Sequence, residues 1–277
     1  MKLDYFTLIS PDALHIHGVG DIKSPTLSEI SKLESKINTY NYYVTILLLN
    51  IGSYYEEFEK EEGMFFYYPN DLKNKMLKLR DEYASMDNKQ KEKITFYNFL
   101  MNDDILKFKV AEALNFFIVD KVEFSDKYNM FVTYNGDLDD DGNLKITGAI
   151  HAAIYDDVID IIMQRINIEN KRQEKKNLKI KNKIAEKLLE KMKKGESRQK
   201  KNDEKTSMAN IISSLSSHHQ SLNIVNIWNL TVYQLYDQFS KTRINDTYKI
   251  SSRSVSIWGD KDKKFDDMLW MTMCNKN

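Results

Sequence analysis

The apolar positions along the chain mostly repeat with the period of an α-helix. Leu106, Val110, Leu114 and Phe117 follow one another at intervals of three or four residues. This spacing puts the four side chains on one face of a helix, where they would form part of a core. Similar patterns predict helices over 24–37, 40–60, 71–86, 91–100, 103–117, 151–166, 207–217 and 232–241.

Two shorter regions instead alternate between apolar and polar residues, which is typical of strands. Residues 4–10 and 14–19 predict two N-terminal strands. Residues 131–134 and 144–147 predict the two strands of a hairpin near 129–147. The fold class is therefore expected to be mainly α with a small β component.

The same patterns suggest how the chain divides into domains. We expect an acidic, mainly helical N-terminal domain over 1–168 and a basic helix with a linker over 169–206. A small helical C-terminal domain with a Trp-bearing tail would follow over 207–277. The prediction is thus of two helical lobes joined by a basic helix.

Several of the predicted helices begin with residues that favour helix starts. Ser24 precedes a proline and is a suitable N-cap, and Asp103 or Asp104 can cap the helix that follows. Thr231 stands three residues before Gln234, which is the spacing of a capping box. This last helix has the clearest start signal in the sequence.

Composition is that of a folded protein made in a reducing compartment. The 277 residues include 42% apolar and 12% aromatic residues, enough for real cores. The lone Cys274 cannot form an intramolecular disulfide. The N-terminus has no apolar run of signal-peptide length, and the longest apolar run, 42–49, is far too short to span a membrane, so an intracellular protein is expected.

Charge is distributed very unevenly along the chain, although the total is zero. Residues 171–205 hold 15 Lys and Arg against 6 Asp and Glu, a local net charge of +9, and the remainder sums to −9. An apolar stripe from Ile184 to Met192 predicts a helix of about five turns in this segment. Gly195 is suited to end it, and 197–206 would be a linker.

Lys183, Lys187 and Lys191 stack like charges one helical turn apart within this segment. Such a row suits contact with an acidic surface, either a lobe of this chain, another copy in a homo-oligomer, a partner protein or nucleic acid. The segment contains no Phe, Tyr or Trp on which bases could stack, and it matches no DNA-binding motif. A connector or protein-docking helix is therefore favoured over a nucleic-acid site.

The hairpin loop contains the strongest metal-site candidate in the sequence. Asp137, Asp139 and Asp141 are spaced as the first half of a calcium-binding loop. The twelfth position, which normally supplies a bidentate Glu, is Gly148, and the flanks are predicted strands instead of helices. The pattern favours an acidic hairpin tip over a calcium site.

Other groups with chemical potential are equally incomplete. His15 and His17 would share one face of a strand, but no further ligand follows at metal-site spacing. The carboxylate run in 56–62 is typical of a solvated helix face. The sequence shows no P-loop and no nucleophile elbow. We therefore expect no cofactor, no metal and no enzymatic activity.

The C-terminal tail carries Trp258, Phe265 and Trp270 among charged residues. Aromatic side chains of this kind dominate many binding hot spots. The tail is either a strap folded over its own domain or a segment that docks on a partner protein.

Three stretches resemble proteins encoded among the tail genes of phages and prophages of Gram-positive bacteria. They are GVGDIKSPTLSEI at 18–30, NIWNLTVYQLYDQF at 226–239, and the tail that begins with Trp258-Gly259. These proteins are generally called tail assembly chaperones. The resemblance covers both ends and the basic middle of the chain.

The resemblance implies a non-enzymatic role in tail assembly in the host cytoplasm, with no membrane involved. Such a chaperone would coat the tape-measure protein and help to recruit tail-tube subunits. Trp258, Phe265, Trp270 and the three lysines would then be partner-binding residues. A structural component of the tail or baseplate in the virion is one alternative, and a nucleic-acid-binding accessory protein is a second.

Overall fold

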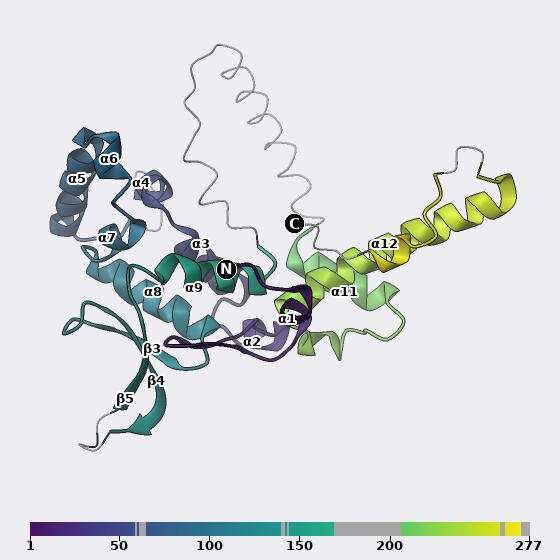
Figure 1. The fold of residues 1–277 in the computed structure, drawn as a ribbon, viewed down its shortest axis with the longest axis horizontal. Helices are drawn as coiled ribbons and strands as arrows, with labels where there is room; N and C mark the ends of the chain where they lie inside the picture. Colours follow the sequence, from purple (N-terminus) through teal and green to yellow (C-terminus); the bar gives the residue numbers. More distant parts are fainter. Residues whose placement is uncertain are drawn as a thin grey trace, which may run out of the picture. The chain divides into compact units, whose positions relative to one another are not determined.

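The computed structural model describes residues 1–58, 60, 65–139, 142, 144–168, 206–260 and 264–272 (Figure 1). Helices dominate, and the strands form one two-stranded and one three-stranded sheet. The predicted class, mainly α with a small β component, is confirmed. No helix in these ranges is both long and apolar enough to span a membrane.

The chain folds into two compact units that are not two simple halves of the sequence. Unit 1 comprises residues 1–3, 12–25 and the described residues from Ile30 to Ile168. Unit 2 comprises residues 4–11, 26–29 and the described residues from Thr206 onward. The predicted domain boundary at 168 borders the undescribed residues 169–205 and stays a prediction.

Unit 1 is built on a set of helices around an aromatic and aliphatic core. Helix α8 is central: α3 packs against it, and Leu106, Val110, Leu114 and Phe117 of α8 are all fully buried, as their spacing predicted. The helices of this unit are α3 (Ile37–Leu48), α4 (Ile51–Phe58), α5 (Asn70–Ser85), α6 (Asn88–Lys91), α7 (Phe96–Leu100), α8 (Asp104–Phe117) and α9 (Tyr155–Arg165). A short α2 (Leu27–Ser31) runs from unit 2 into unit 1.

Two antiparallel sheets complete unit 1. Its strands are β1 (Leu14–Ile16), β2 (Gly20–Ile22), β3 (Lys121–Ser125), β4 (Met130–Leu138) and β5 (Leu144–Ile150). The predicted hairpin is confirmed as β4–β5, with Phe131 opposite Ile150. The neighbouring strand β3, which pairs with residues 130–134 of β4, was not predicted.

The first N-terminal strand is a wrong prediction, because residues 5–9 form helix α1 (Tyr5–Ile9). Asp4 caps it: its carboxylate accepts hydrogen bonds from the backbone N–H of Thr7 at 3.0 Å and from the Thr7 hydroxyl at 2.6 Å. The short alternation over residues 4–10 does not outweigh such a local cap. The second predicted strand corresponds to β1.

Three predicted helices begin or divide differently from their patterns. Helix α2 starts after Thr26, which forms reciprocal hydrogen bonds with Glu29, so Ser24 is not the cap. The predicted helix 40–60 is broken after Leu48, because the Asn50 side chain accepts from the Ser53 N–H at 3.0 Å and starts α4. The predicted helix 91–100 is likewise replaced by α6 and α7.

Unit 2 is organised by one long helix. Its elements are α1, α11 (Met208–His218), the 3₁₀ turn η2 (Ile227–Asn229), α12 (Val232–Trp258) and the 3₁₀ turn η3 (Leu269–Met271). The predicted helix 232–241 is correct at its start but too short, since α12 continues without a break to Trp258. No Pro or Gly interrupts residues 242–258, so nothing in the backbone ends the helix earlier.

N-terminal residues are integral to unit 2. The Tyr5 hydroxyl donates to the buried carboxylate of Asp237 at 2.7 Å. The Gln234 side chain donates to the Ile9 carbonyl at 2.9 Å, and residue 26 forms an isolated β-bridge with Thr231. Residues 4–11 and 26–29 thus contact the first turns of α12, although more than 200 residues separate them in the sequence.

Candidate functional site

Helix α12 has well-defined signals at both ends. The Thr231 hydroxyl accepts from the Gln234 N–H at 3.2 Å, and the Gln234 side chain accepts from the Thr231 N–H at 3.0 Å, which confirms the predicted capping box. Gly259 ends the helix with a φ of 74°, a conformation that glycine adopts at little cost. The 27 residues between them form a rod about 40 Å long.

The first half of α12 is covered by other parts of unit 2. Val232, Tyr233 and Leu235 are buried, and both α1 and α11 pack against the helix. At the end of α11, His218 Nε2 lies 2.9 Å from the Asp246 carboxylate. Helix α11 therefore covers α12 as far as Asp246. Beyond Asp246 the helix continues past α11.

The second half of α12 carries large apolar side chains in solvent. Ile250 is 70% exposed, Ile257 is 69% exposed and Trp258 is 75% exposed. Intervals of seven and eight residues place all three on one side of the helix. We call these three side chains the distal α12 face. An exposed apolar group of this kind is typical of a site that another protein covers.

The tail beyond Trp258 turns back along α12, as Figure 1 shows in yellow. The Phe265 ring stacks on Tyr248 with centroids 5.8 Å apart, and Lys241 Nζ donates to the Thr272 carbonyl at 2.7 Å. Trp270 remains 48% exposed. The tail therefore packs on its own helix at Phe265 while leaving Trp258 and Trp270 in solvent. Their proposed role in partner binding stays a prediction.

The other predicted partner-binding residues cannot be placed. Lys183, Lys187 and Lys191 lie outside the described residues, together with the whole predicted basic helix. Ile250 and Ile257 were not singled out from the sequence. Their seven-residue spacing was a signal for them, but it falls in a Ser-rich stretch that was not predicted to be helical.

The acidic hairpin tip is organised by its own hydrogen bonds. Asn135 donates to the Asp137 carboxylate at 2.8 Å and accepts from the Asp137 N–H at 3.0 Å, and Gly142 N donates to the Asp139 carbonyl at 3.0 Å. Asp141 lies outside the described residues. Within the described ranges, no three His, Cys, Asp or Glu side chains are gathered as metal ligands. Of the two histidines considered as metal ligands, His15 has its Nδ1 atom 2.7 Å from the Asp21 carboxylate.

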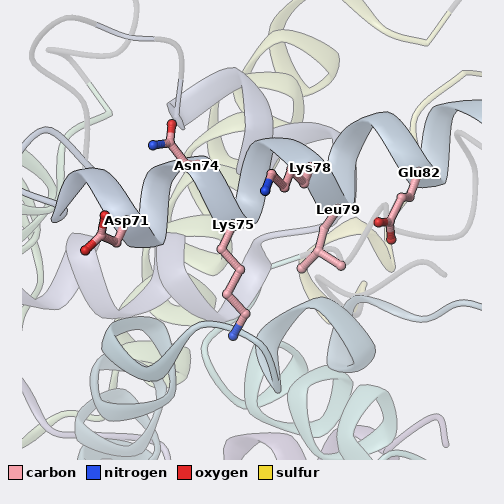
Figure 2. Close-up of a pocket in the computed structure, with 6 residues that line it drawn as sticks. All are labelled: Asp71, Asn74, Lys75, Lys78, Leu79 and Glu82. Carbon is pink, nitrogen blue, oxygen red and sulfur yellow. The ribbon is translucent and has the colours of Figure 1, made fainter.

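A shallow depression of about 480 Å³ lies along one face of α5 (Figure 2). Figure 2 shows its lining side chains projecting from successive turns of this single helix, with Lys75 extending away from it. Lys75 Nζ is engaged by the Asn102 carbonyl at 2.8 Å. The lining residues are Asp71, Asn74, Lys75, Lys78, Leu79 and Glu82. These side chains are of mixed charge and mostly exposed to solvent.

A buried pair of titratable side chains links two helices of unit 1. Asp103 is fully buried, caps α8 by accepting from the Leu106 N–H at 2.9 Å, and accepts from the Tyr54 hydroxyl at 2.8 Å. Burial raises the pKa of the Asp103 carboxyl above its ordinary value, and burial together with that carboxylate raises the pKa of Tyr54. This arrangement ties α4 to the start of α8.

Comparisons with known proteins bear on the C-terminal region. No curated protein and no solved structure matches the chain significantly. Residues 198–275 match the family model of the YomV second domain. This family is phage-derived and of the type found in the Bacillus prophage SPbeta. The part of the chain that contains α11, α12 and the tail is therefore similar to a phage-derived domain, which confirms the expected resemblance to phage proteins to that extent.

Proposed function

We propose that this chain is a non-enzymatic phage protein of tail morphogenesis that works by binding another protein. In this proposal it acts in the host cytoplasm as an assembly chaperone for the tape-measure protein, tail-tube subunits or both. The phage-derived match at 198–275 supports a phage role. The tail-gene resemblance of 18–30 and 226–239 supports the assembly role.

The observation that carries the proposal is the distal α12 face. Three large apolar side chains on two turns of a helix are costly to leave in water, and each fully covered one contributes about 1.5–3 kcal/mol. The phage-associated domain includes this face and the Trp-bearing tail. A partner with an apolar helix face, such as a long helical tape-measure protein, would cover both.

A direct test is capture of a phage tape-measure protein by the tagged full-length chain. We expect the wild type to capture it and the double variant Ile250→Ser/Ile257→Ser to lose most of that capture. Phe108→Ser is a matched control, because Phe108 is also an exposed apolar side chain on a helix but lies in unit 1. It should bind like the wild type.

Two results would contradict the proposal. One is failure of the wild type to capture the tape-measure protein or tail-tube subunits when all are soluble. The other is equal loss of capture in the control and the double variant. Mass spectrometry of purified virions separates the chaperone from a structural tail or baseplate component, since a chaperone is absent from virions and a structural component is stoichiometric.

A further inference from the structure

The distal α12 face has the geometry of a helix-docking site. Ile250 and Ile257 of this face line up with Arg243 and Arg253 at successive intervals of seven, three and four residues, so these four residues form one stripe along the helix. From Arg243 to Trp258 this stripe extends about 23 Å, the length of roughly four helical turns. A straight stripe of this kind packs against a second helix, whose side chains fill the gaps between its own.

The side chains around the stripe make it basic. Arg243, Lys249 and Arg253 are all exposed, and the acidic residue among them is Asp246. The Asp246 carboxylate is already engaged, with His218 Nε2 at 2.9 Å and Lys249 Nζ at 3.7 Å. Among the described residues, Arg243 and Arg253 form no ion pair. Their charge is therefore available to a partner.

We infer that the distal α12 face binds an amphipathic helix of another protein whose apolar stripe is flanked by acidic residues. The inference rests on the proposed function for the existence of a protein partner and adds the partner's chemistry. Carboxylates beside the partner's stripe would meet Arg243, Lys249 and Arg253 while its apolar residues cover Ile250 and Ile257.

Charge also argues against two occupants that this chain could supply, the same face of a second copy and the basic segment 171–205. A second copy would bring the same three cations against one another, and like charges across an interface oppose association. The segment 171–205 carries a net charge of +9, so it would be repelled as well. An acidic partner helix satisfies both the apolar and the charged features of the face.

An anionic membrane surface is a different partner class that a basic apolar helix face could attract. Exposed apolar and cationic side chains alone do not distinguish such a surface from a protein helix. The membrane is therefore an outcome for the test to exclude.

Two synthetic amphipathic peptides test the inference on the full-length chain. Both have about three heptads with Leu at the a and d positions, and they differ only in carrying Glu or Lys at the flanking positions. Binding is followed by fluorescence anisotropy, with vesicles containing phosphatidylglycerol as a third probe. We expect the Glu peptide to bind about tenfold or more tightly than the Lys peptide, and to weaken as salt increases.

Two variants sharpen this test, and circular dichroism checks that both remain folded. Ile250→Ser/Ile257→Ser should lose the Glu peptide. The triple reversal Arg243→Glu/Lys249→Glu/Arg253→Glu should keep the apolar contacts and invert the preference, so that the Lys peptide binds more tightly. Such an inversion requires direct charge contact and would not follow from a general loss of stability.

Equal affinity for the two peptides, an unchanged preference in the triple variant, or binding to the vesicles alone would each overturn the inference. These outcomes are separate from those of the tape-measure experiment. Capture of the tape-measure protein without a peptide preference leaves the proposed function standing and removes this inference. A peptide preference without capture of the tape-measure protein would contradict the proposed function and support the inferred chemistry of the partner helix.

Discussion

At the scale of single residues, local hydrogen-bonding signals were the most predictable part of the fold. Asp103 was identified as one of two candidate caps for α8, and Thr231 with Gln234 as a capping box, because each signal lies within four residues of sequence. The role of Asp103 as an acceptor for Tyr54 could not be predicted in the same way. It depends on the packing of α4, 49 residues earlier in the chain.

Asp103 makes the stability of unit 1 depend on pH. Its folded-state pKa is raised above the ordinary value of 3.8, so the native state keeps a proton that the unfolded state has lost over the interval between the two values. Stability from this group therefore falls as pH rises through that interval. Asn has no such charge, so we expect the stability of Asp103→Asn relative to wild type to increase as pH is raised from below 3.8.

Urea unfolding of both proteins over a series of pH values measures the difference in their free energies of unfolding. The contributions of all other titrating groups are common to both proteins and cancel to first order. The variant keeps an oxygen to cap α8. A difference that stays constant with pH would show that burial does not disfavour the carboxylate.

Gly148 is required by close packing between the two sheets of unit 1. A Cβ at this position would lie 2.6 Å from the Gly18 carbonyl oxygen and 2.6 Å from the Thr133 hydroxyl. The Gly18 oxygen is fixed, because it also accepts from the Ala149 N–H at 2.8 Å. We expect Gly148→Ala to lower the free energy of unfolding by about 1–3 kcal/mol.

Thermal or urea unfolding checks this expectation, with Lys145→Ala as the control on an exposed position of the same strand. The control should change stability by no more than about 0.5 kcal/mol. Equal stability of the two variants would contradict the close approach of Gly148 to the Gly18 carbonyl.

At the scale of elements, α5 and α8 were predictable, whereas short segments, the break between α3 and α4 and the second half of α12 were not. Helices α5 and α8 lie within a few residues of their predictions because each has a sustained apolar face. Helix α1 was taken for a strand, because the short stretch 4–10 does not distinguish the helical period from the strand period. Strand β3 was missed because its extended conformation depends on pairing with β4.

The start of α12 can be tested by removing its cap. Thr231→Ala abolishes the side-chain hydrogen bond to the Gln234 N–H, and we expect a loss of about 0.5–2 kcal/mol. Thr242→Ala is a matched control inside the same helix, where the hydroxyl donates only to the Gln238 carbonyl at 2.8 Å. It should be close to neutral by urea unfolding. Equal losses in the two variants would contradict a specific capping role.

At the scale of the whole molecule, the two units and the candidate site depend on contacts that no local pattern contains. Nothing in residues 4–11 indicates that they belong with α12. Similarly, the spacing of Ile250 and Ile257 indicates a shared face, but it does not indicate exposure. Their exposure follows from where α11 ends and from the side on which the tail returns.

The tie between the N-terminal segment and unit 2 gives a further prediction. Tyr5→Phe removes the hydroxyl that donates to the buried Asp237 carboxylate, which should cost about 1–3 kcal/mol in unit 2. Trp228, Trp258 and Trp270 all belong to unit 2, so Trp fluorescence during urea unfolding reports on this unit. Tyr67→Phe, at an exposed site in unit 1, is the control and should leave that transition unchanged.

The central claim is that this chain binds a partner protein through the distal α12 face, and hydrogen exchange tests it most directly. Amide exchange of the full-length chain would be compared with and without the tape-measure protein, because covered and stabilised segments exchange more slowly. The account predicts new protection concentrated in residues 243–258 and absent from the Ile250→Ser/Ile257→Ser variant. Protection confined to unit 1, or equal protection in that variant, would contradict it.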